Sequence, residues 1–359
     1  MNKKEVLLLM FMGQSNMAGR GNAKEAPGLI EGAGYEYRAV TAPDCLSPLS
    51  EPFGEKENNE NGVTEPGMKT GSMVSAFVNA CYLETGIPIV GVSCSKGGSS
   101  IAEWLPDTPY YRDAVRRMKR CEEWLLGHGY RIKRKDMVWC QGCTDGDLHT
   151  TPAVYKAQTE KFLQSYCQEC GLSKCFLIQI GNHRDDKTLY EPIQQAQTAL
   201  AEENENIILV SSLFKTFAER GLMKDEYHYC QKGYNLAGEE AGKNTGKYMT
   251  ADLSSPEITD GKDSRADGMA SANQGERQKG EGFVIKFLSL LRKSKRLICY
   301  GKIPFMKIPV FPVHTLLSGS APGTATGHRP LSGGSASPIV FSSAQIRAHA
   351  QTGSFRVPR

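Results

Sequence analysis

The stretch VLLLMFMGQSNMAGRG, residues 6–21, decides the fold of this chain. Its first seven residues are all apolar, without the alternation of a strand that has one face in water. A continuous apolar run of this kind is typical of a strand covered on both faces in a parallel sheet. The Gly-rich turn that follows, from Gly13 to Gly21, ends the strand and favours a tight connection into a helix.

Four more short apolar runs predict the remaining strands, at residues 88–94, 137–140, 175–180 and 207–212. Apolar residues at helical spacing predict helices at residues 70–84, 111–126, 153–170, 190–203 and 229–248. Because each parallel connection needs a covering helix, we predict a three-layer α/β/α sandwich with a five-stranded parallel sheet. In such a sheet the active site lies beyond the carboxyl ends of the strands.

Composition divides the chain into three parts. Residues 1–250 form the predicted α/β domain, in which we interpret the polar stretch 22–67 as a loop that walls a pocket. Residues 251–282 lack aromatic side chains, so we interpret them as a polar linker. Residues 283–359 are basic and become rich in small residues, which predicts a mostly disordered or irregular tail. A basic amphipathic helix at the start of this tail, lying on a membrane surface, is the alternative.

Length and charge exclude several classes of protein. The chain has 359 residues and a formal net charge of +4, but no Asp or Glu follows Glu281. Residues 1–281 carry 32 basic and 39 acidic side chains, so the main body is acidic and we expect no nucleic-acid partner. No apolar run reaches the length of a membrane-spanning helix, so we expect no integral membrane segment. The oligomeric state is left open.

The cysteines and the N-terminal residues indicate the compartment. The 11 cysteines are scattered, and the C-x-x-C of Cys140 and Cys143 has no second pair to complete a zinc site. We therefore expect free thiols, no metal and a reducing compartment. Residues 1–12 resemble a short signal peptide but lack an Ala-x-Ala cleavage site. We interpret the apolar run as a buried strand and predict a cytoplasmic protein.

Polar and Gly residues stand just after the predicted strands. Ser15 lies in the Gly-flanked turn after the first strand, where a nucleophile would be placed; a helix N-cap is the alternative. Gly97 and Gly98 follow the second strand, where they offer N–H donors to a ligand or simply turn the chain. Gln141 follows the third strand, and its amide either serves as an oxyanion donor or caps local backbone.

Asp225 and His228 follow the last predicted strand. An Asp three residues before a His can turn back, so that its carboxylate accepts a hydrogen bond from Nδ1 of the imidazole. That contact would fix the tautomer and leave Nε2 as a base. A surface Asp and His at a helix start are the alternative.

Taken in order, these blocks resemble the SGNH-hydrolase superfamily, and within it the sialate O-acetylesterase-like and acetylxylan-esterase-like carbohydrate esterases of the family 6 type. The similar blocks are GQSNMAGRG (residues 13–21), GGSSI with Trp104 (97–104), W-x-Q-G-x-x-D (139–145) and D-x-x-H (225–228). Ser99 stands where Thr is usual. The resemblance covers residues 5–247 and implies a flavodoxin-like SGNH hydrolase fold.

The resemblance implies an esterase that hydrolyses acetyl esters of sugars, such as sialic acid, acetylated xylan or another oligosaccharide. Ser15 would attack the acetyl carbonyl, His228 would take and return its proton, and Asp225 would orient His228. The oxyanion would lie among the N–H groups of Ser15 and Gly98 and the side-chain amide of Gln141. This mechanism needs no metal and no cofactor.

Substrate contacts are expected at three further residues, Asn16, Trp104 and Arg184. Trp104 would contact the apolar face of a sugar, together with Tyr227 and the loop at residues 22–67; ordinary core packing is the alternative. Arg184 would meet a substrate carboxylate such as that of a sialic acid; a solvated loop residue is the alternative.

One position departs from the family pattern. Cys143 stands where the third block normally has Glu, so a carboxylate that helps to order the site is missing. We expect an active fold with a changed rate or specificity. Two alternatives stay open: an SGNH hydrolase of other short acyl esters or thioesters, and a catalytically impaired carbohydrate-binding homologue.

Overall fold

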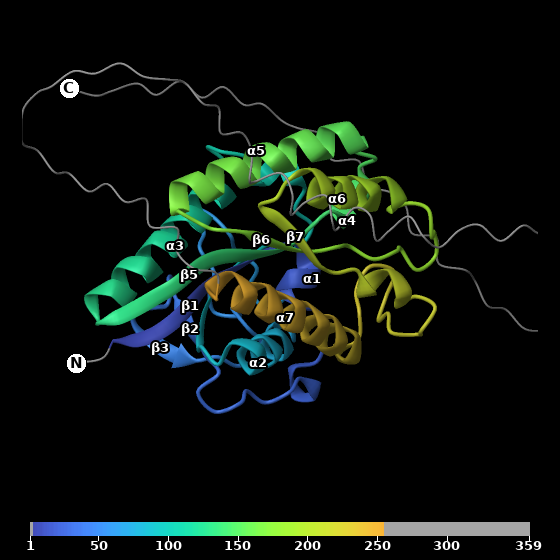
Figure 1. Cartoon of the computed structure of the whole chain (residues 1–359). Helices are drawn as coiled ribbons and strands as arrows, with labels where there is room; N and C mark the ends of the chain where they lie inside the picture. The colour runs from blue at the N-terminus through green and yellow to red at the C-terminus, as the bar shows by residue number, and fades with distance from the viewer. Residues whose placement is uncertain (1–2, 255–359) are drawn as a thin grey trace, which may run out of the picture. The chain divides into compact units, whose positions relative to one another are not determined.

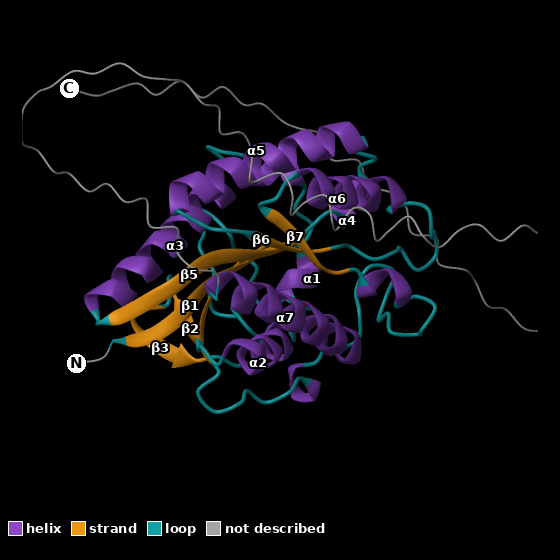
Figure 2. Ribbon diagram, in the orientation of Figure 1, coloured by secondary structure: helices purple, strands orange, loops and turns teal. Residues whose placement is uncertain are grey.

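A computed structural model describes residues 3–254 of the chain. Within this range it has an α/β fold, with one mostly parallel sheet of seven strands and helices on both of its faces (Figures 1 and 2). The predicted tail at residues 283–359 and nearly all of the predicted linker at 251–282 lie outside the described residues. The first residues of that linker are helical, because α7 (Gln231–Leu253) continues through them.

The apolar run that opens the chain is the central strand. β1 (Lys4–Gly13) is buried over all but its first two residues. It pairs in parallel with β4 (Ile89–Ser95) on one side and with β5 (Tyr130–Cys140) on the other. β6 (Cys175–Ile178) and β7 (Ile207–Ser211) extend the sheet beyond β5, again in parallel. All five predicted strands are present, and burial of β1 and β4 on both faces explains why their sequences do not alternate between apolar and charged residues.

The predicted number of strands is too small. Two more strands, β2 (Gly34–Arg38) and β3 (Ala42–Pro48), lie within the stretch that we interpreted as a loop. β2 pairs in parallel with β4, and β3 pairs antiparallel with β2, which gives the order β3-β2-β4-β1-β5-β6-β7. Their sequences, GYEYR and APDCLSP, contain no apolar run. β3 is an edge strand without a buried residue, and β2 beside it keeps Glu36 and Arg38, which form an ion pair with each other.

Helices cover both faces of the sheet (Figure 1). α3 (Pro109–Gly127), α5 (Pro152–Cys170) and α6 (Glu191–Glu203) pack on one face, against one set of alternate side chains of β1. α2 (Val74–Thr85) and α7 pack on the other face, against the second set. All five predicted helices are therefore present. The shorter helices are α1 (Ser15–Ala18), α4 (Cys143–Asp147) and the 3-10 turns η1 (Ala23–Glu25), η2 (Ile101–Trp104) and η3 (Leu213–Thr216).

The strand register brings three loops to one edge of the sheet. Gly13 at the end of β1 is the partner of Ser95 in β4 and of Cys140 in β5. The turns that follow these three strands therefore begin side by side, as the rule for parallel sheets predicts.

The described residues bear on two further expectations. Their ten cysteines are all free thiols. None of the helices within residues 3–254 is long and apolar enough to cross a membrane. The cytoplasmic location stays a prediction.

Candidate active site

Ser15 is the first residue of α1, two residues beyond the end of β1. Gly13 permits the turn, since its φ is +137° and a Cβ there would lie 2.0 Å from the carbonyl oxygen of Cys140. Only Gly allows this approach of the β1 end to β5. Ser15 is 6% exposed, and its remaining surface faces a cavity.

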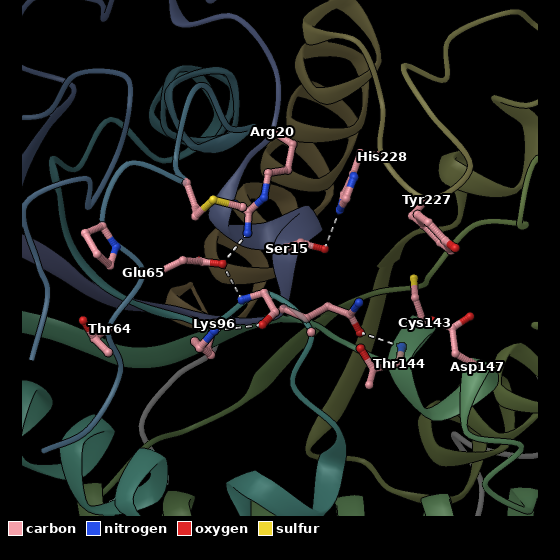
Figure 3. Close-up of a pocket in the computed structure, with 15 residues that line it drawn as sticks. Ser15, Arg20, Thr64, Glu65, Lys96, Cys143, Thr144, Asp147, Tyr227 and His228 are labelled. Atoms are coloured by element: carbon pink, nitrogen blue, oxygen red, sulfur yellow. Dashed lines mark hydrogen bonds and ion pairs between the residues drawn. The ribbon is translucent and has the colours of Figure 1, made fainter. Parts of the chain in front are cut away.

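His228 reaches Ser15 from the loop before α7 (Figure 3). Its Nε2 lies 2.9 Å from the hydroxyl oxygen of Ser15, and its Nδ1 lies 2.9 Å from Oδ2 of Asp225. The other carboxylate oxygen accepts the backbone N–H of Tyr227 at 2.9 Å and that of His228 at 2.7 Å. The turn from Asp225 to His228 thus holds the carboxylate against the imidazole, and the structure brings the three predicted residues together.

These contacts fix which nitrogen of a neutral His228 carries the proton. An ionised carboxylate can only accept, so in the neutral imidazole Nδ1 carries the proton and Nε2 accepts from the Ser15 hydroxyl. Burial alone would raise the pKa of Asp225, but the hydrogen bonds from His228 and from two backbone N–H groups hold it below its ordinary value. Asp225 is therefore ionised at neutral pH, and it stabilises a proton that His228 gains. The arrangement is able to deprotonate Ser15.

The hydroxyl of Ser15 opens on a cavity of about 490 Å³, a size typical of small-molecule sites. Figure 3 shows that the cavity has two unlike sides, with Ser15 between them. One side consists of Arg20, Thr64, Glu65 and Lys96, and the other of Cys143, Thr144, Asp147 and Tyr227. The stretch 22–67 thus contributes to the wall of the cavity, as the sequence predicts.

The backbone N–H groups of Ser15 and Gly98 have no acceptor within residues 3–254. Ser15 lies at the start of α1, where helix geometry leaves the N–H free. Gly98 turns the chain after β4 with a φ of +69°. Both residues line the cavity, so both predicted backbone donors are available to a ligand.

Gln141 does not reach this cavity. Its side chain is fully buried, and Nε2 donates to the carbonyl oxygen of Ser99 at 3.0 Å and to the carboxylate of Asp145. Both N–H bonds of the amide are thereby used, and neither is left for the oxyanion that we assigned to it. Gln141 instead ties the end of β5 to the loop that carries Gly98.

Asn16 and Trp104, two predicted substrate contacts, are buried and do not line the cavity. Nε1 of Trp104 donates to the hydroxyl of Ser99 at 3.0 Å, so this ring belongs to the core. Nδ2 of Asn16 donates to the carbonyl oxygen of Tyr227 at 3.1 Å, and its Oδ1 accepts from the hydroxyl of Tyr234 at 2.8 Å. Both polar atoms of the Asn16 side chain therefore have protein partners. Through the bond to Tyr227, Asn16 holds the loop that carries His228 against α1.

Arg184, the third predicted substrate contact, also lies outside the lining of the cavity. Its guanidinium forms ion pairs with Asp185 at 3.0 Å and with Glu226 at 2.7 Å. Its backbone N–H donates to the carbonyl oxygen of Glu226 at 3.0 Å. Since Glu226 follows Asp225 directly, Arg184 supports the Asp225–His228 turn rather than facing a substrate.

The sequence did not identify four charged residues that line the cavity: Arg20, Glu65, Lys96 and Asp147. Arg20 and Glu65 form a buried ion pair, and Oε1 of Glu65 also accepts the N–H of Gly97 at 2.9 Å. Lys96 lies on the same side and donates to the carbonyl oxygen of Gly97 at 3.2 Å. Arg20 belongs to the first sequence block, GQSNMAGRG, and this position beside Ser15 could have identified it as a residue of the site. Glu65 lies in a polar stretch without a motif, so only the fold brings it near Ser15.

Cys143 lines the cavity at the start of α4. Burial, together with the negative charge of Asp147, raises the pKa of its thiol to about 12, so it stays neutral at physiological pH. Asn16 donates to its sulfur at 3.9 Å. Among residues 3–254, no group of three or more His, Cys, Asp and Glu side chains is placed to hold a metal ion.

Comparison with known proteins places this chain in a family. A family model described as "Carbohydrate esterase, sialic acid-specific acetylesterase" matches residues 4–246. The chain belongs to this family. It is therefore an esterase of the carbohydrate acetylesterase type, and the resemblance carried by the four sequence blocks is confirmed. A search of curated proteins found no significant match to this carbohydrate esterase.

Solved structures are similar to this carbohydrate esterase. A protein from Arabidopsis thaliana is 21% identical, with a TM-score of 0.51 over 69% of this chain and 99% of that one. A carbohydrate acetylesterase from Xanthomonas citri is 14% identical, with a TM-score of 0.43 over 67% of this chain and 56% of its own. An acetyl-xylooligosaccharide esterase from Geobacillus is 12% identical, with a TM-score of 0.37 over 72% of this chain and 98% of its own. The Arabidopsis likeness supports the fold.

Proposed function

We propose that this esterase removes acetyl groups from sugar hydroxyls through an acyl-enzyme, with Ser15 as nucleophile, His228 as base and Asp225 as its partner. The observation that carries the proposal is the continuous chain of hydrogen bonds from Asp225 through His228 to Ser15, 2.9 Å at each step. This chain ends in a cavity of about 490 Å³, which suits a sugar ring. The acetyl-sugar class of substrate follows from the family.

In the first half-reaction, Oγ of Ser15 bonds to the acetyl carbonyl carbon while its proton passes to Nε2 of His228. The carbonyl electron pair moves onto oxygen, where the N–H groups of Ser15 and Gly98 stabilise the negative charge. The bond from carbon to the sugar oxygen then breaks, and His228 gives its proton to that oxygen. The sugar leaves with a free hydroxyl, and the acetyl group stays on Ser15.

In the second half-reaction, water attacks the acetyl carbon as its proton passes to Nε2 of His228. The bond to Oγ breaks, the proton moves from His228 to Ser15, and acetic acid leaves and ionises to acetate in solution. His228 is transiently positive in both halves, and ionised Asp225 stabilises that charge. Cys143 is a neutral thiol where the family pattern has Glu, so Asp225 is the carboxylate on which His228 depends.

The two sides of the cavity suggest how the ester is oriented. We propose that the sugar lies on the side of Arg20 and Lys96, whose N–H groups suit sugar hydroxyls. The acetyl methyl group then lies beside Cys143 and Tyr227, on the opposite side of Ser15 (Figure 3). Sialic acid and acetylated xylan are both candidate sugars.

The first test compares wild type with Ser15→Ala in hydrolysis of 4-nitrophenyl acetate, with circular dichroism on both. We expect turnover of the folded Ser15→Ala protein to fall to background, because removal of the nucleophile leaves no acyl-enzyme route. The matched control is Ser173→Ala. Ser173 is exposed at the opposite ends of the strands, before β6, so this variant should keep wild-type turnover.

The outcomes separate the three readings of the site. Full activity of folded Ser15→Ala contradicts the mechanism. No activity in wild type favours the impaired carbohydrate-binding homologue, with Cys143 as the disabling change. If wild type is active, its rates of acetate release from acetylated xylan and from O-acetylated sialic acid identify the preferred sugar. A series of longer acyl esters and thioesters tests the remaining alternative, which would be favoured if a longer chain is hydrolysed faster than acetate.

A further inference from the structure

The side-chain amide of Gln14 also lines the cavity, and no role was predicted for it from the sequence. Gln14 directly precedes Ser15 and lines the cavity with Ser15, Gly98 and His228. It is 3% exposed, so its amide lies in a largely closed, water-poor position. In such surroundings a polar side chain needs partners for its oxygen and its nitrogen.

The contacts of Gln14 fix which way the amide faces. Its Oε1 accepts the backbone N–H of Gly142 at 2.7 Å and that of Thr144 at 3.4 Å. Because a backbone N–H can only donate, the oxygen of the amide must face these two groups, and Nε2 must face away from them.

Nε2 of Gln14 has no acceptor among the described residues, although nearly all buried amides have one. Some polar atoms in residues 3–254 are fully buried and have no partner, but Nε2 of Gln14 is not among them. Nε2 therefore keeps some accessible surface. The accessible surface left to Nε2 therefore opens on the cavity that Gln14 lines. The two N–H bonds of Nε2 are therefore free to donate to a ligand in the cavity, beside Ser15.

We propose that Nε2 of Gln14 is the third oxyanion donor of this esterase, beside the backbone N–H groups of Ser15 and Gly98. The inference rests on the proposed function. Gln141, the amide assigned this role from the sequence, has both N–H bonds in use. Gln14 meets the physical requirement for such a donor, because Gly142 and Thr144 hold the amide in place before substrate arrives.

Two substitutions test this role. Gln14→Glu keeps an oxygen that accepts from Gly142 and Thr144, but it replaces the donating nitrogen. Gln14→Met removes the donor without adding a negative charge. For each folded variant we expect kcat for 4-nitrophenyl acetate to fall by about 10²–10³, with KM changed by less than about threefold. The affinity for a boronic acid that forms a tetrahedral adduct with Ser15 should fall in parallel, whereas a purely structural role would not link these two losses.

The controls separate failure of this inference from failure of the proposed function. Wild-type turnover with inactive Ser15→Ala must be established first; if either is absent, the proposed function fails, and the inference fails with it. With that established, a folded Gln14→Glu or Gln14→Met that keeps turnover within about threefold of wild type overturns the role of Gln14 alone. If Gln14→Met does not fold, Gln14→Glu decides: parallel losses of kcat and boronate affinity support the role, and a loss of kcat without a loss of boronate affinity overturns it.

Discussion

At the residue scale, the site combines one locally determined contact with several that depend on distant segments. The Asp225–His228 contact spans three residues, and the same carboxylate also accepts two backbone N–H groups of that turn. Such a contact is readable from sequence, because a short polar side chain hydrogen-bonds its own turn in many contexts. The Ser15–His228 contact joins residues 213 positions apart, so it depends on the whole fold.

Gln141 gives a prediction at this scale. Gln141→Ala removes the donor to the buried carbonyl oxygen of Ser99 and to Asp145, and it leaves a small cavity. We expect the free energy of unfolding to fall by about 2–4 kcal/mol, measured by urea denaturation. We expect kcat of the folded protein to fall by less than about tenfold, since the amide does not face the cavity.

The matched control for Gln141→Ala is Gln164→Ala, on the exposed face of α5, which should change neither stability nor turnover. A loss of about 100-fold in kcat without a loss of stability in Gln141→Ala would return the oxyanion role to Gln141.

At the scale of elements, the close contact of α2 with α7 depends on small residues. Gly238, Gly242 and Gly246 recur every four residues along α7 and so lie on one face of this helix. A Cβ at Gly238 would lie 2.3 Å from the carbonyl oxygen of Met73, and one at Gly242 would lie 2.2 Å from that of Phe77. The backbones of the two helices are therefore in direct contact. This matters for the site, because the loop that carries His228 leads into α7.

The helix contact predicts that Gly242→Ala destabilises the protein, although Ala is the better helix former by about 1 kcal/mol. The added methyl group would force α7 away from Phe77, and we expect a net loss of about 1–3 kcal/mol in the free energy of unfolding. Thermal denaturation followed by circular dichroism measures it.

Gly127→Ala is the control for this substitution. Gly127 ends α3 in an exposed position, and a Cβ there would meet nothing within 4 Å. Its stability should be unchanged or slightly higher than that of wild type. Equal melting temperatures for Gly242→Ala and Gly127→Ala would contradict the close contact of α2 and α7.

At the scale of the whole molecule, the sheet, its covering helices and the cavity all lie within residues 3–254. The last helix contributes a long-range contact near its end, where Asp252 forms an ion pair with the buried guanidinium of Arg134 in β5. Arg134 also pairs with Asp136 at 3.0 Å. The predicted boundary at residue 250 therefore falls inside α7, four residues before the last described position.

This arrangement predicts the outcome of truncation. A chain that ends at residue 254 should fold and keep wild-type kcat with 4-nitrophenyl acetate, because it contains every residue of the cavity. A chain that ends at residue 250 lacks Asp252 and so loses its ion pair with Arg134. We expect the free energy of unfolding to fall by about 1 kcal/mol and the melting temperature by about 2–4 °C. Failure of the 254-residue chain to give soluble, active protein would show that later residues are needed.

Much of the fold was predictable from the sequence, and the part that was missed has a physical cause. Buried parallel strands such as β1 and β4 carry long apolar runs, and helices such as α3 carry apolar residues at helical spacing. β2 and β3 carry neither signal, because β3 is the edge strand and both strands keep polar side chains.

Within the site, the structure brings together those predicted residues that sit in short, conformationally demanding turns. Predicted residues whose side chains point away from these turns lie outside the cavity lining. Ser15 and Gly98 are placed by the backbone of the turns that follow β1 and β4. Asn16, Trp104 and Arg184 stand next to such turns, but their polar atoms pair with other protein groups instead of facing the cavity. Adjacency along the chain does not determine the direction of a side chain.

The sequence by itself determined the alternation of strands and helices, the turn that presents Ser15, and the pairing of Asp225 with His228. Each of these depends on interactions within a few residues or on a periodic pattern of burial. Only the tertiary structure decided which glutamine amide faces the cavity and that Glu65 joins its wall. The direction of an amide depends on the partners that it finds across the fold. Gly142 lies 128 residues from Gln14, and Ser99, one of the two partners of Gln141, lies 42 residues from it.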